Sequence, residues 1–283
     1  MSVNLLNKLF AFIKISRPLN AFITFISIIV ASLICTTLGF PFLKVILAAA
    51  AGGFTAAAGN VINDIFDIQI DKLNKPNRPL ANNTLTKNSA IAFYILLNFV
   101  SLVLALWVGF LPFLIVLITI AVLFVYSSIL KRKILLGNIT IAFLTGLAFV
   151  YGGVVVGNWK LSIIPAAFAF VINLIREIVK DMEDKEGDSK LGVITFPQKF
   201  GFALAKKTIL FFSVLLIAAT FFPYVLGIYN IKFFLIVMII VNPLIVYMLR
   251  SLFIDDSVKN LNKLSSLLKL SMLFGLAAIY FGR

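Results

Sequence analysis

Hydrophobic stretches long enough to cross a membrane constrain the fold of this chain more than any other feature. A helix of about 20 apolar residues spans the hydrocarbon core of a bilayer. Nine such stretches follow one another, at approximately 20–38, 44–66, 89–109, 111–130, 138–157, 161–180, 207–227, 231–250 and 264–281. The sequence therefore predicts an all-α, polytopic membrane protein with nine transmembrane helices, forming a single domain over residues 1–283.

The composition agrees with a membrane protein and excludes several kinds of site. Hydrophobic residues make up 61% of the 283 positions. A single cysteine, Cys35, excludes an internal disulfide, and the lack of histidine excludes imidazole bases and the usual zinc sites. No small-residue cleavage site precedes the first span. This span is therefore expected to be retained rather than removed as a signal peptide.

The basic residues predict a membrane orientation rather than a nucleic-acid partner. They give a net charge of +14, but nearly all of the 25 lie near the ends of apolar stretches. A surface segment that interleaves basic and aromatic residues, as nucleic-acid binding requires, is absent from the sequence. Counting spans assigns all but four basic residues to the side of the N-terminus, the exceptions being Lys44, Lys160, Lys232 and Arg283. The positive-inside rule makes that side cytoplasmic in a cell membrane.

The acidic residues gather at the ends of the second and sixth predicted spans. Nine of the 11 fall in these two windows. The same spacing recurs 117 residues apart in two sets, Asp64, Asp67 and Asp71, and then Asp181, Asp184 and Asp188. Steps of three and four residues place each set on one helix face. Carboxylates at the end of a hydrophobic span are costly and indicate a function, and both sets are expected on the cytoplasmic side.

Clustered carboxylates without histidine or cysteine suit a hard cation, Mg2+ or Ca2+. Mg2+ commonly shares its carboxylate ligands with a substrate phosphate. Basic residues that could bind such a phosphate lie beside both clusters: Arg78, Lys131, Arg132, Arg176 and Lys180. A diphosphate at the membrane surface, with an apolar chain running into a bundle that contains 29 phenylalanines, indicates a polyprenyl diphosphate substrate.

These motifs resemble those of the UbiA superfamily of intramembrane prenyltransferases. Asn63-Asp64-x-x-Asp67-x-x-x-Asp71 resembles its first aspartate-rich motif, and Lys180-x-x-x-Asp184-x-x-x-Asp188 resembles its second. Three further segments are similar to segments of the family: Arg17-Pro18-x-Asn20, Arg78-Pro79 and Tyr126-Ser127-x-x-Leu130-Lys131. The resemblance implies a UbiA-type helical bundle, an Mg2+ cofactor, a polyprenyl diphosphate donor and a lipophilic acceptor within the membrane lipids.

The resemblance also implies roles for individual residues. The metal ligands would be Asn63, Asp64, Asp67, Asp184 and Asp188. The donor diphosphate would be bound by Arg78, Lys131, Lys180 and Tyr126. Asp64, Asp67, Asp184, Asp188 and Lys180 form the expected catalytic set, with Asp71 and Asp181 in support. The acceptor would meet Arg176, Arg17 and Asn20.

The acceptor is suggested by one position in the second motif. Quinone-forming members usually carry tyrosine where this chain has Arg176, and in this respect the motif resembles the digeranylgeranylglyceryl phosphate synthase group. That likeness implies transfer of a geranylgeranyl group to the sn-2 hydroxyl of geranylgeranylglyceryl phosphate. An aromatic acceptor, 4-hydroxybenzoate or a naphthoate, is the alternative. A transporter is a more distant alternative. A transporter is expected to carry its charged residues near the bilayer midplane, whereas the acidic residues of this chain lie at the ends of the predicted spans.

Several other residues have structural interpretations. Gly152, Gly153 and Gly157 are expected to permit close helix packing. Glu183 and Glu186 are expected to point away from the Asp184 stripe into solvent. Lys199, Lys206 and Lys207 are expected to contact lipid headgroups.

Overall fold

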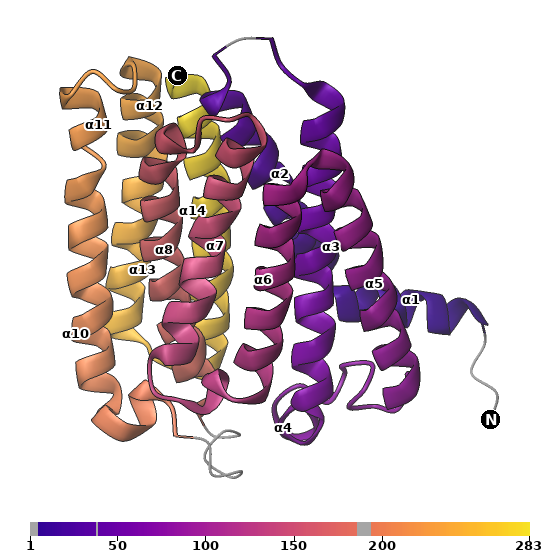
Figure 1. The fold of residues 1–283 in the computed structure, drawn as a ribbon. Helices are drawn as coiled ribbons and strands as arrows, with labels where there is room; N and C mark the ends of the chain where they lie inside the picture. The colour runs from indigo at the N-terminus through magenta and orange to yellow at the C-terminus, as the bar shows by residue number, and fades with distance from the viewer. Residues whose placement is uncertain (1–4, 38, 186–193) are drawn as a thin grey trace.

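The computed structural model describes residues 5–37, 39–185 and 194–283. Within these ranges every regular element is helical (Figure 1). The α-helices are α1 (Leu5–Ser16), α2 (Pro18–Cys35), α3 (Phe42–Phe66), α4 (Ile68–Asn74), α5 (Lys87–Val108), α6 (Phe110–Ser128), α7 (Leu136–Val155), α8 (Ile163–Glu183), α10 (Phe196–Ala219), α11 (Phe222–Val225), α12 (Ile231–Ile236), α13 (Asn242–Ile254) and α14 (Val258–Gly282). Three shorter elements complete the chain: η1 (Leu130–Arg132), η2 (Trp159–Ser162) and the π-helical turn η3 (Val237–Val241).

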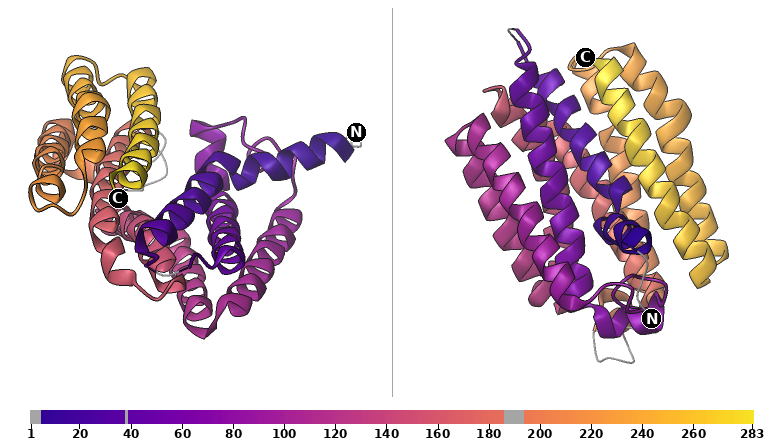
Figure 2. Two further views of the ribbon diagram at one scale, coloured as in Figure 1. Left: turned by 90° about the horizontal axis from the view of Figure 1, so that it is seen from above. Right: turned by 90° about the vertical axis from the view of Figure 1, so that its right-hand side faces the viewer.

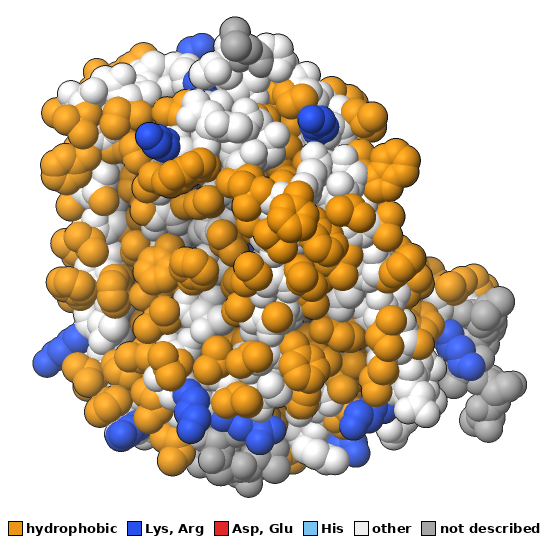
Figure 3. All heavy atoms as spheres, in the orientation of Figure 1, with side chains coloured by type: hydrophobic (Ala, Val, Ile, Leu, Met, Phe, Trp, Pro, Cys, Tyr) orange, Lys and Arg blue, Asp and Glu red, His pale blue; other side chains and the backbone are white. Residues whose placement is uncertain are grey.

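The prediction of nine transmembrane helices is confirmed for the described part of the chain, where nine helical segments are long and apolar enough to cross a membrane. Apolar side chains cover the middle of the molecule, and Lys and Arg side chains lie near its two ends (Figure 3). Large apolar side chains such as Trp107 and Phe110 are 78% and 70% exposed, as expected for a surface that contacts lipid rather than water. The protein is therefore a multi-pass membrane protein.

Two spans begin earlier than predicted, because polar residues form their first turns. Helix α10 begins at Phe196, where Thr195 and Gln198 form a capping box, and it bends at Gly201, whose φ is 82°. Helix α14 begins at Val258, where the Ser257 hydroxyl accepts a hydrogen bond from the Asn260 N–H. A search for apolar stretches cannot detect these polar turns. The spans predicted at 161–180 and 207–227 therefore leave too long a connection between them, residues 181–206.

Helix α1 was not predicted by the search for membrane spans. It lies crosswise to the spans and projects from one side of the bundle, beside α5 (Figure 1). Its Ala11 and Ile15 are buried against α3 and its neighbours, while Phe10 and Ile13 stay exposed. The Lys14 ammonium donates a hydrogen bond to the Asn77 carbonyl at 2.8 Å. This two-sided helix has the character of an element lying in the membrane interface.

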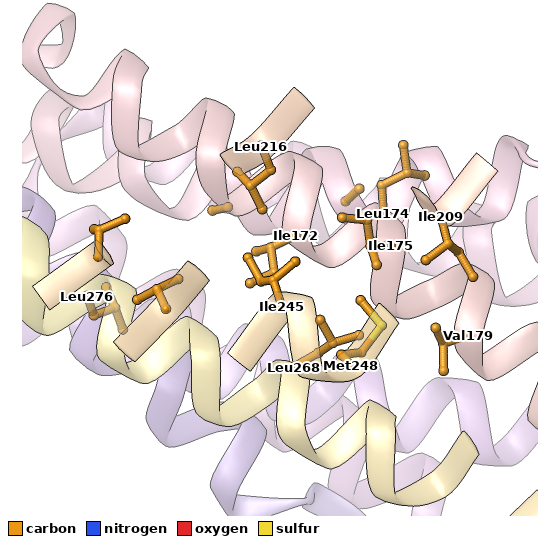
Figure 4. Close-up of a cluster of buried hydrophobic side chains, with 14 of the residues drawn as sticks. Ile172, Leu174, Ile175, Val179, Ile209, Leu216, Ile245, Met248, Leu268 and Leu276 are labelled. Carbon is orange, nitrogen blue, oxygen red and sulfur yellow. The ribbon is translucent and has the colours of Figure 1, made fainter. Parts of the chain in front are cut away.

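The spans follow one another around a curved row, so that α14 returns beside α2 (Figure 2). Helix α8 packs against α7, α10 and α14. Its Ile175 and Val179 contribute to a large buried cluster with Ile209 of α10, Met248 of α13 and Leu268 of α14 (Figure 4). This packing fixes the position of α8, which carries the second acidic cluster.

The expectation for the three glycines is met only in part. A Cβ atom on Gly152 or Gly153 would meet atoms of neighbouring elements at 2.6 and 2.7 Å, so both glycines permit close packing. Gly157 instead has a φ of 78° in the turn after α7, where a Cβ would meet nothing within 4 Å. Lys206 forms an ion pair with Asp256 at 2.9 Å, and the contact of Lys199, Lys206 and Lys207 with lipid headgroups stays a prediction.

Candidate active site

The first acidic cluster lies where α3 ends and α4 begins. Asp64 is in the last turn of α3, Asp67 joins the two helices, and Asp71 is in α4. The backbone stays close to helical, because the N–H groups of Asp67 and Asp71 still donate to the carbonyls four residues earlier, at 3.0 and 2.8 Å. Each aspartate is at most 4% exposed. The common face predicted from the spacing is therefore retained across the junction.

Two arginines compensate the charge of Asp64 and Asp71. Arg17, at the start of α2, and Arg78, in the loop after α4, both form ion pairs with one oxygen of Asp64, Arg78 at 3.0 Å. Arg78 also pairs with Asp71 at 2.6 Å. Burial raises the pKa of Asp71, and the nearby Arg78 partly opposes that shift. Burial of Arg78 lowers its pKa, but the neighbouring Asp64 and Asp71 carboxylates outweigh this effect, so the pKa of Arg78 is raised.

Asp67 and Asn63 face the open space of the site. The carboxylate of Asp67 forms an ion pair with Lys131 of η1. The Asn63 side-chain oxygen is buried and has no hydrogen-bond partner among the described residues. A buried acceptor without a donor is costly, so this oxygen is suited to an added donor or cation.

The second cluster lies at the end of α8. Asp184 is the residue after the last helical position, and it forms an ion pair with Lys75 of the loop after α4 at 2.9 Å. Asp181 accepts a hydrogen bond from Asn138 of α7 at 2.9 Å. Asp188 and Glu186 lie outside the described residues. The Lys75–Asp184 pair links the loop of the first cluster directly to the second.

Glu177 is a site residue that the sequence analysis missed. It is buried on α8, and it forms ion pairs with Arg176 at 2.9 Å and with Lys180 at 3.3 Å. Its position four residues before Asp181 places it on the same helix face, and that spacing could have identified it. Glu183, expected in solvent, is only partly exposed and accepts a hydrogen bond from Asn262 of α14 at 2.8 Å.

The two acidic clusters face each other across a polar cavity of about 70 Å³. From the first motif, Asn63, Asp67 and Asp71 line it, and from the second, Lys180, Asp181 and Asp184. Its remaining polar walls include Arg17, Lys75, Arg78, Tyr126, Lys131 and Glu177. Asp64 lies behind this wall, where the two arginines hold it. The predicted meeting of the two motifs is therefore realised in the fold.

A second, larger cavity of about 300 Å³ extends from the polar one into the bundle. The two cavities share Arg17, Asn63, Tyr126, Glu177 and Lys180 as lining residues. Most of the larger cavity is apolar, with Phe149, Phe168 and Phe233 among its lining residues. Asn20 and Arg176 also line it, close to the shared residues. A ligand with a charged head and a long hydrocarbon chain would match this pair of cavities.

The described carboxylates do not form a ready-made cage for a metal: among them, no group of three or more lies in ligating proximity. They are paired with Arg17, Arg78, Lys131 and Lys75 instead. The donor set nevertheless fits Mg2+, which takes few protein carboxylates and completes its coordination with water and phosphate oxygens. The unpartnered Asn63 oxygen beside Asp67 is the observation that supports this fit.

Comparison with known proteins identifies the family. A profile of the UbiA prenyltransferase family matches residues 24–273. The digeranylgeranylglyceryl phosphate synthase of Methanothermobacter thermautotrophicus is 40% identical over 222 residues, 77% of each chain. A solved structure of a digeranylgeranylglyceryl phosphate synthase superposes with a TM-score of 0.76 at 34% identity, covering 97% of this chain and 98% of that one.

A more distant structure shares the fold. A UbiA homologue from Archaeoglobus fulgidus, bound to GPP and Mg2+, superposes with a TM-score of 0.66 at 20% identity, covering 95% of this chain and 99% of that chain. The likenesses in sequence and in fold both extend over most of the molecule, including both acidic clusters. The chain belongs to the UbiA prenyltransferase family, and it is a membrane-embedded prenyltransferase.

Proposed function

We propose that this prenyltransferase uses Mg2+ to transfer a geranylgeranyl group from its diphosphate to the sn-2 hydroxyl of geranylgeranylglyceryl phosphate, a step in ether lipid synthesis. The observation that carries the proposal is the polar cavity between two acidic clusters, which opens into an apolar cavity. The relatives named digeranylgeranylglyceryl phosphate synthase support this donor and acceptor. The GPP and Mg2+ of the Archaeoglobus fulgidus homologue support the cofactor.

In the polar cavity, the carboxylates would bind the metal and the basic side chains would bind the donor diphosphate. Asn63, Asp67 and Asp184 would hold Mg2+, together with Asp64 and Asp188. When bound, Mg2+ neutralises charge on the donor diphosphate and so assists its departure from the allylic carbon. Arg78, Lys131 and Lys180 would bind the diphosphate oxygens, with Tyr126 beside them. Asp71 and Asp181 would position these groups, Asp71 through Arg78 and Asp181 through Asn138.

The apolar cavity would hold the prenyl chain and exclude water from the reacting carbon. An alcohol is a weak nucleophile, so the reaction depends on positive charge that develops at the allylic carbon as its bond to the diphosphate oxygen breaks. The acceptor oxygen then bonds to that carbon, and the hydroxyl proton passes to the released diphosphate or to a carboxylate of the polar cavity. Aromatic faces such as those of Phe149 and Phe168 can stabilise that charge. Arg176, Arg17 and Asn20 line the same cavity and would orient the acceptor. 4-Hydroxybenzoate and a naphthoate each carry a carboxylate with one negative charge, whereas a phosphate monoester carries up to two, so the neighbouring Arg17 and Arg176 favour the phosphorylated acceptor.

Removal of divalent metal is expected to abolish the reaction. Purified protein with labelled geranylgeranyl diphosphate and geranylgeranylglyceryl phosphate should form labelled ether lipid with Mg2+ and none with EDTA. The reason is that cations of the chain alone leave the departing diphosphate incompletely neutralised. Added Mg2+ in excess of EDTA should restore transfer. Undiminished transfer in EDTA would contradict the Mg2+ requirement.

We also infer that the protein lies in the cell membrane with the polar cavity toward the cytoplasm, since basic residues concentrate on that side. Cysteines placed at the exposed residues Asn82 and Lys160 report on opposite sides. A membrane-impermeant maleimide should label Lys160→Cys in intact cells and Asn82→Cys only after permeabilisation. The native Cys35 is 0% exposed and gives no background. The reverse labelling pattern would overturn the orientation.

A further inference from the structure

Lys269 is a charged residue inside a membrane span that has no hydrogen-bond or ion-pair partner in the described part of the chain. It lies in α14, about 16 Å along the helix axis from Val258 at about 1.5 Å per residue. It forms no hydrogen bond and no ion pair with any residue that the structure describes. Leu268 beside it is buried and Leu270 is 43% exposed, so Lys269 lies at the edge between the bundle interior and lipid. An unpaired ammonium at this depth is costly and indicates a function.

The side of α14 that carries Lys269 borders the apolar cavity. Met272 and Leu276, three and seven residues later, fall on the same helix face and line that cavity. The Lys269 charge interacts electrostatically with Arg17 and Arg176, which line the cavity, and also with Glu177 and Glu183. Positive groups from α2, α8 and α14 therefore gather at one side of the cavity.

The helices α2 and α14 meet at one end and separate toward the other. The Arg283 guanidinium, at the end of α14, donates to the carbonyls of Leu33 and Thr36, which holds the two C-terminal ends together. From there the two helices diverge toward the start of α2 and the start of α14 (Figure 2). Residues of both helices line the apolar cavity, Asn20 and Ser27 from α2 and Met272 and Gly275 from α14. Lys269 belongs to the first half of α14, three residues before the cavity-lining Met272.

Carboxylates do not pair with every donor of the positive groups around Lys269. Arg17 is paired with Asp64, and one terminal nitrogen of Arg176 is paired with Glu177. The Arg176 Nε is buried and has no hydrogen-bond partner among the described residues. The Lys269 ammonium has none either. Unsatisfied donors of like charge near one another call for an anion between them.

We propose that Lys269 and Arg176 together bind the phosphate of the acceptor lipid, and that Lys269 is a specificity-determining residue for a phosphorylated acceptor. The inference rests on the proposed function and assigns a residue to it that the sequence motifs do not contain. A phosphomonoester carries more negative charge than the phosphodiester of an ordinary membrane lipid, so paired cations select it. A glycerol phosphate with one prenyl chain would place its phosphate here and its hydrocarbon chain in lipid or in the apolar cavity.

Kinetics of Lys269→Gln with separate titrations of donor and acceptor test the proposal. The KM for geranylgeranylglyceryl phosphate should rise by about tenfold to a hundredfold, which corresponds to the loss of one charge-assisted hydrogen bond. The KM for geranylgeranyl diphosphate should not change. The variant should also lose the preference of the wild type for the phosphorylated acceptor over geranylgeranylglycerol. Lys269→Arg keeps the charge and should restore most of the acceptor affinity.

Lys263→Gln is the matched control, because Lys263 is exposed on the same helix and contacts the Tyr247 hydroxyl instead. It should leave both KM values unchanged. An unchanged acceptor KM in Lys269→Gln, or an equal rise in both KM values, would overturn the role of Lys269. The first result would indicate a lysine that reaches an ordinary lipid headgroup. A wild-type protein that does not prenylate geranylgeranylglyceryl phosphate would overturn the proposed function as well.

Discussion

Replacing Asp67 or Asp184 with asparagine is expected to lower the turnover of prenyl transfer by about a hundredfold or more. The two carboxylates lie on opposite walls of the polar cavity, one from each acidic cluster. Asparagine keeps the shape and removes the charge, so Mg2+ loses a ligand and Lys131 or Lys75 loses its ion pair. Turnover is measured with saturating donor and acceptor over a series of Mg2+ concentrations. The variants should need a higher Mg2+ concentration than the wild type to reach half of their maximal turnover.

Glu183→Gln is the control for these two variants. Glu183 is the neighbour of Asp184 in the chain, is partly exposed, and accepts a hydrogen bond from Asn262 that glutamine can also accept. Its turnover should match that of the wild type. Wild-type turnover in both Asp67→Asn and Asp184→Asn would refute the assignment of the two clusters as the metal site.

Gly152→Ala is expected to destabilise the fold by about 1–3 kcal/mol or more. A Cβ atom at this position would lie 2.6 Å from the Ile28 carbonyl oxygen, 2.7 Å from the Ala31 Cβ and 3.1 Å from the Ser32 nitrogen. Two of these atoms are backbone, so α2 and α7 would have to move apart. The Ser32 hydroxyl also donates to the Gly152 carbonyl at 3.0 Å, and this bond would be strained.

Thermal unfolding in detergent measures this effect, with Gly275→Ala as its control. Gly275 is also within a helix, but a Cβ there would meet nothing within 4 Å. Its midpoint should stay the same or rise, since alanine favours a helix over glycine by about 1 kcal/mol. Equal midpoints for Gly152→Ala and the wild type would show that α2 and α7 are not packed at this distance.

The spans and the meeting of the two motifs could be predicted because they depend on local patterns. Apolar length reveals a membrane span, and steps of three and four residues place Asp64, Asp67 and Asp71 on one face. Among the described residues, Asp67 and Asp71 of the first set and Asp181 and Asp184 of the second line one cavity. Which carboxylates bind metal remains a proposal from the family resemblance.

Features that depend on tertiary contacts could not be predicted in this way. The burial of Glu177 follows from the packing of α8, and the pairing of Lys75 with Asp184 joins residues 109 positions apart. Helix α1 has only 12 residues and carries lysines, so a search for apolar stretches of membrane length does not find it. Lys269 is one lysine among many in the sequence. Only the structure distinguishes it, since it interacts electrostatically with Arg176 and forms no ion pair with any described residue.

Mass spectrometry of the lipid product tests the central claim most directly. Purified protein is given geranylgeranyl diphosphate and Mg2+ with an equimolar mixture of geranylgeranylglyceryl phosphate, geranylgeranylglycerol, 4-hydroxybenzoate and a naphthoate. We predict a product in which glyceryl phosphate carries two geranylgeranyl ethers, formed in preference to any other. A prenylated hydroxybenzoate or naphthoate as the main product would contradict the proposed acceptor, and no prenylated product from any acceptor would contradict the account of the site.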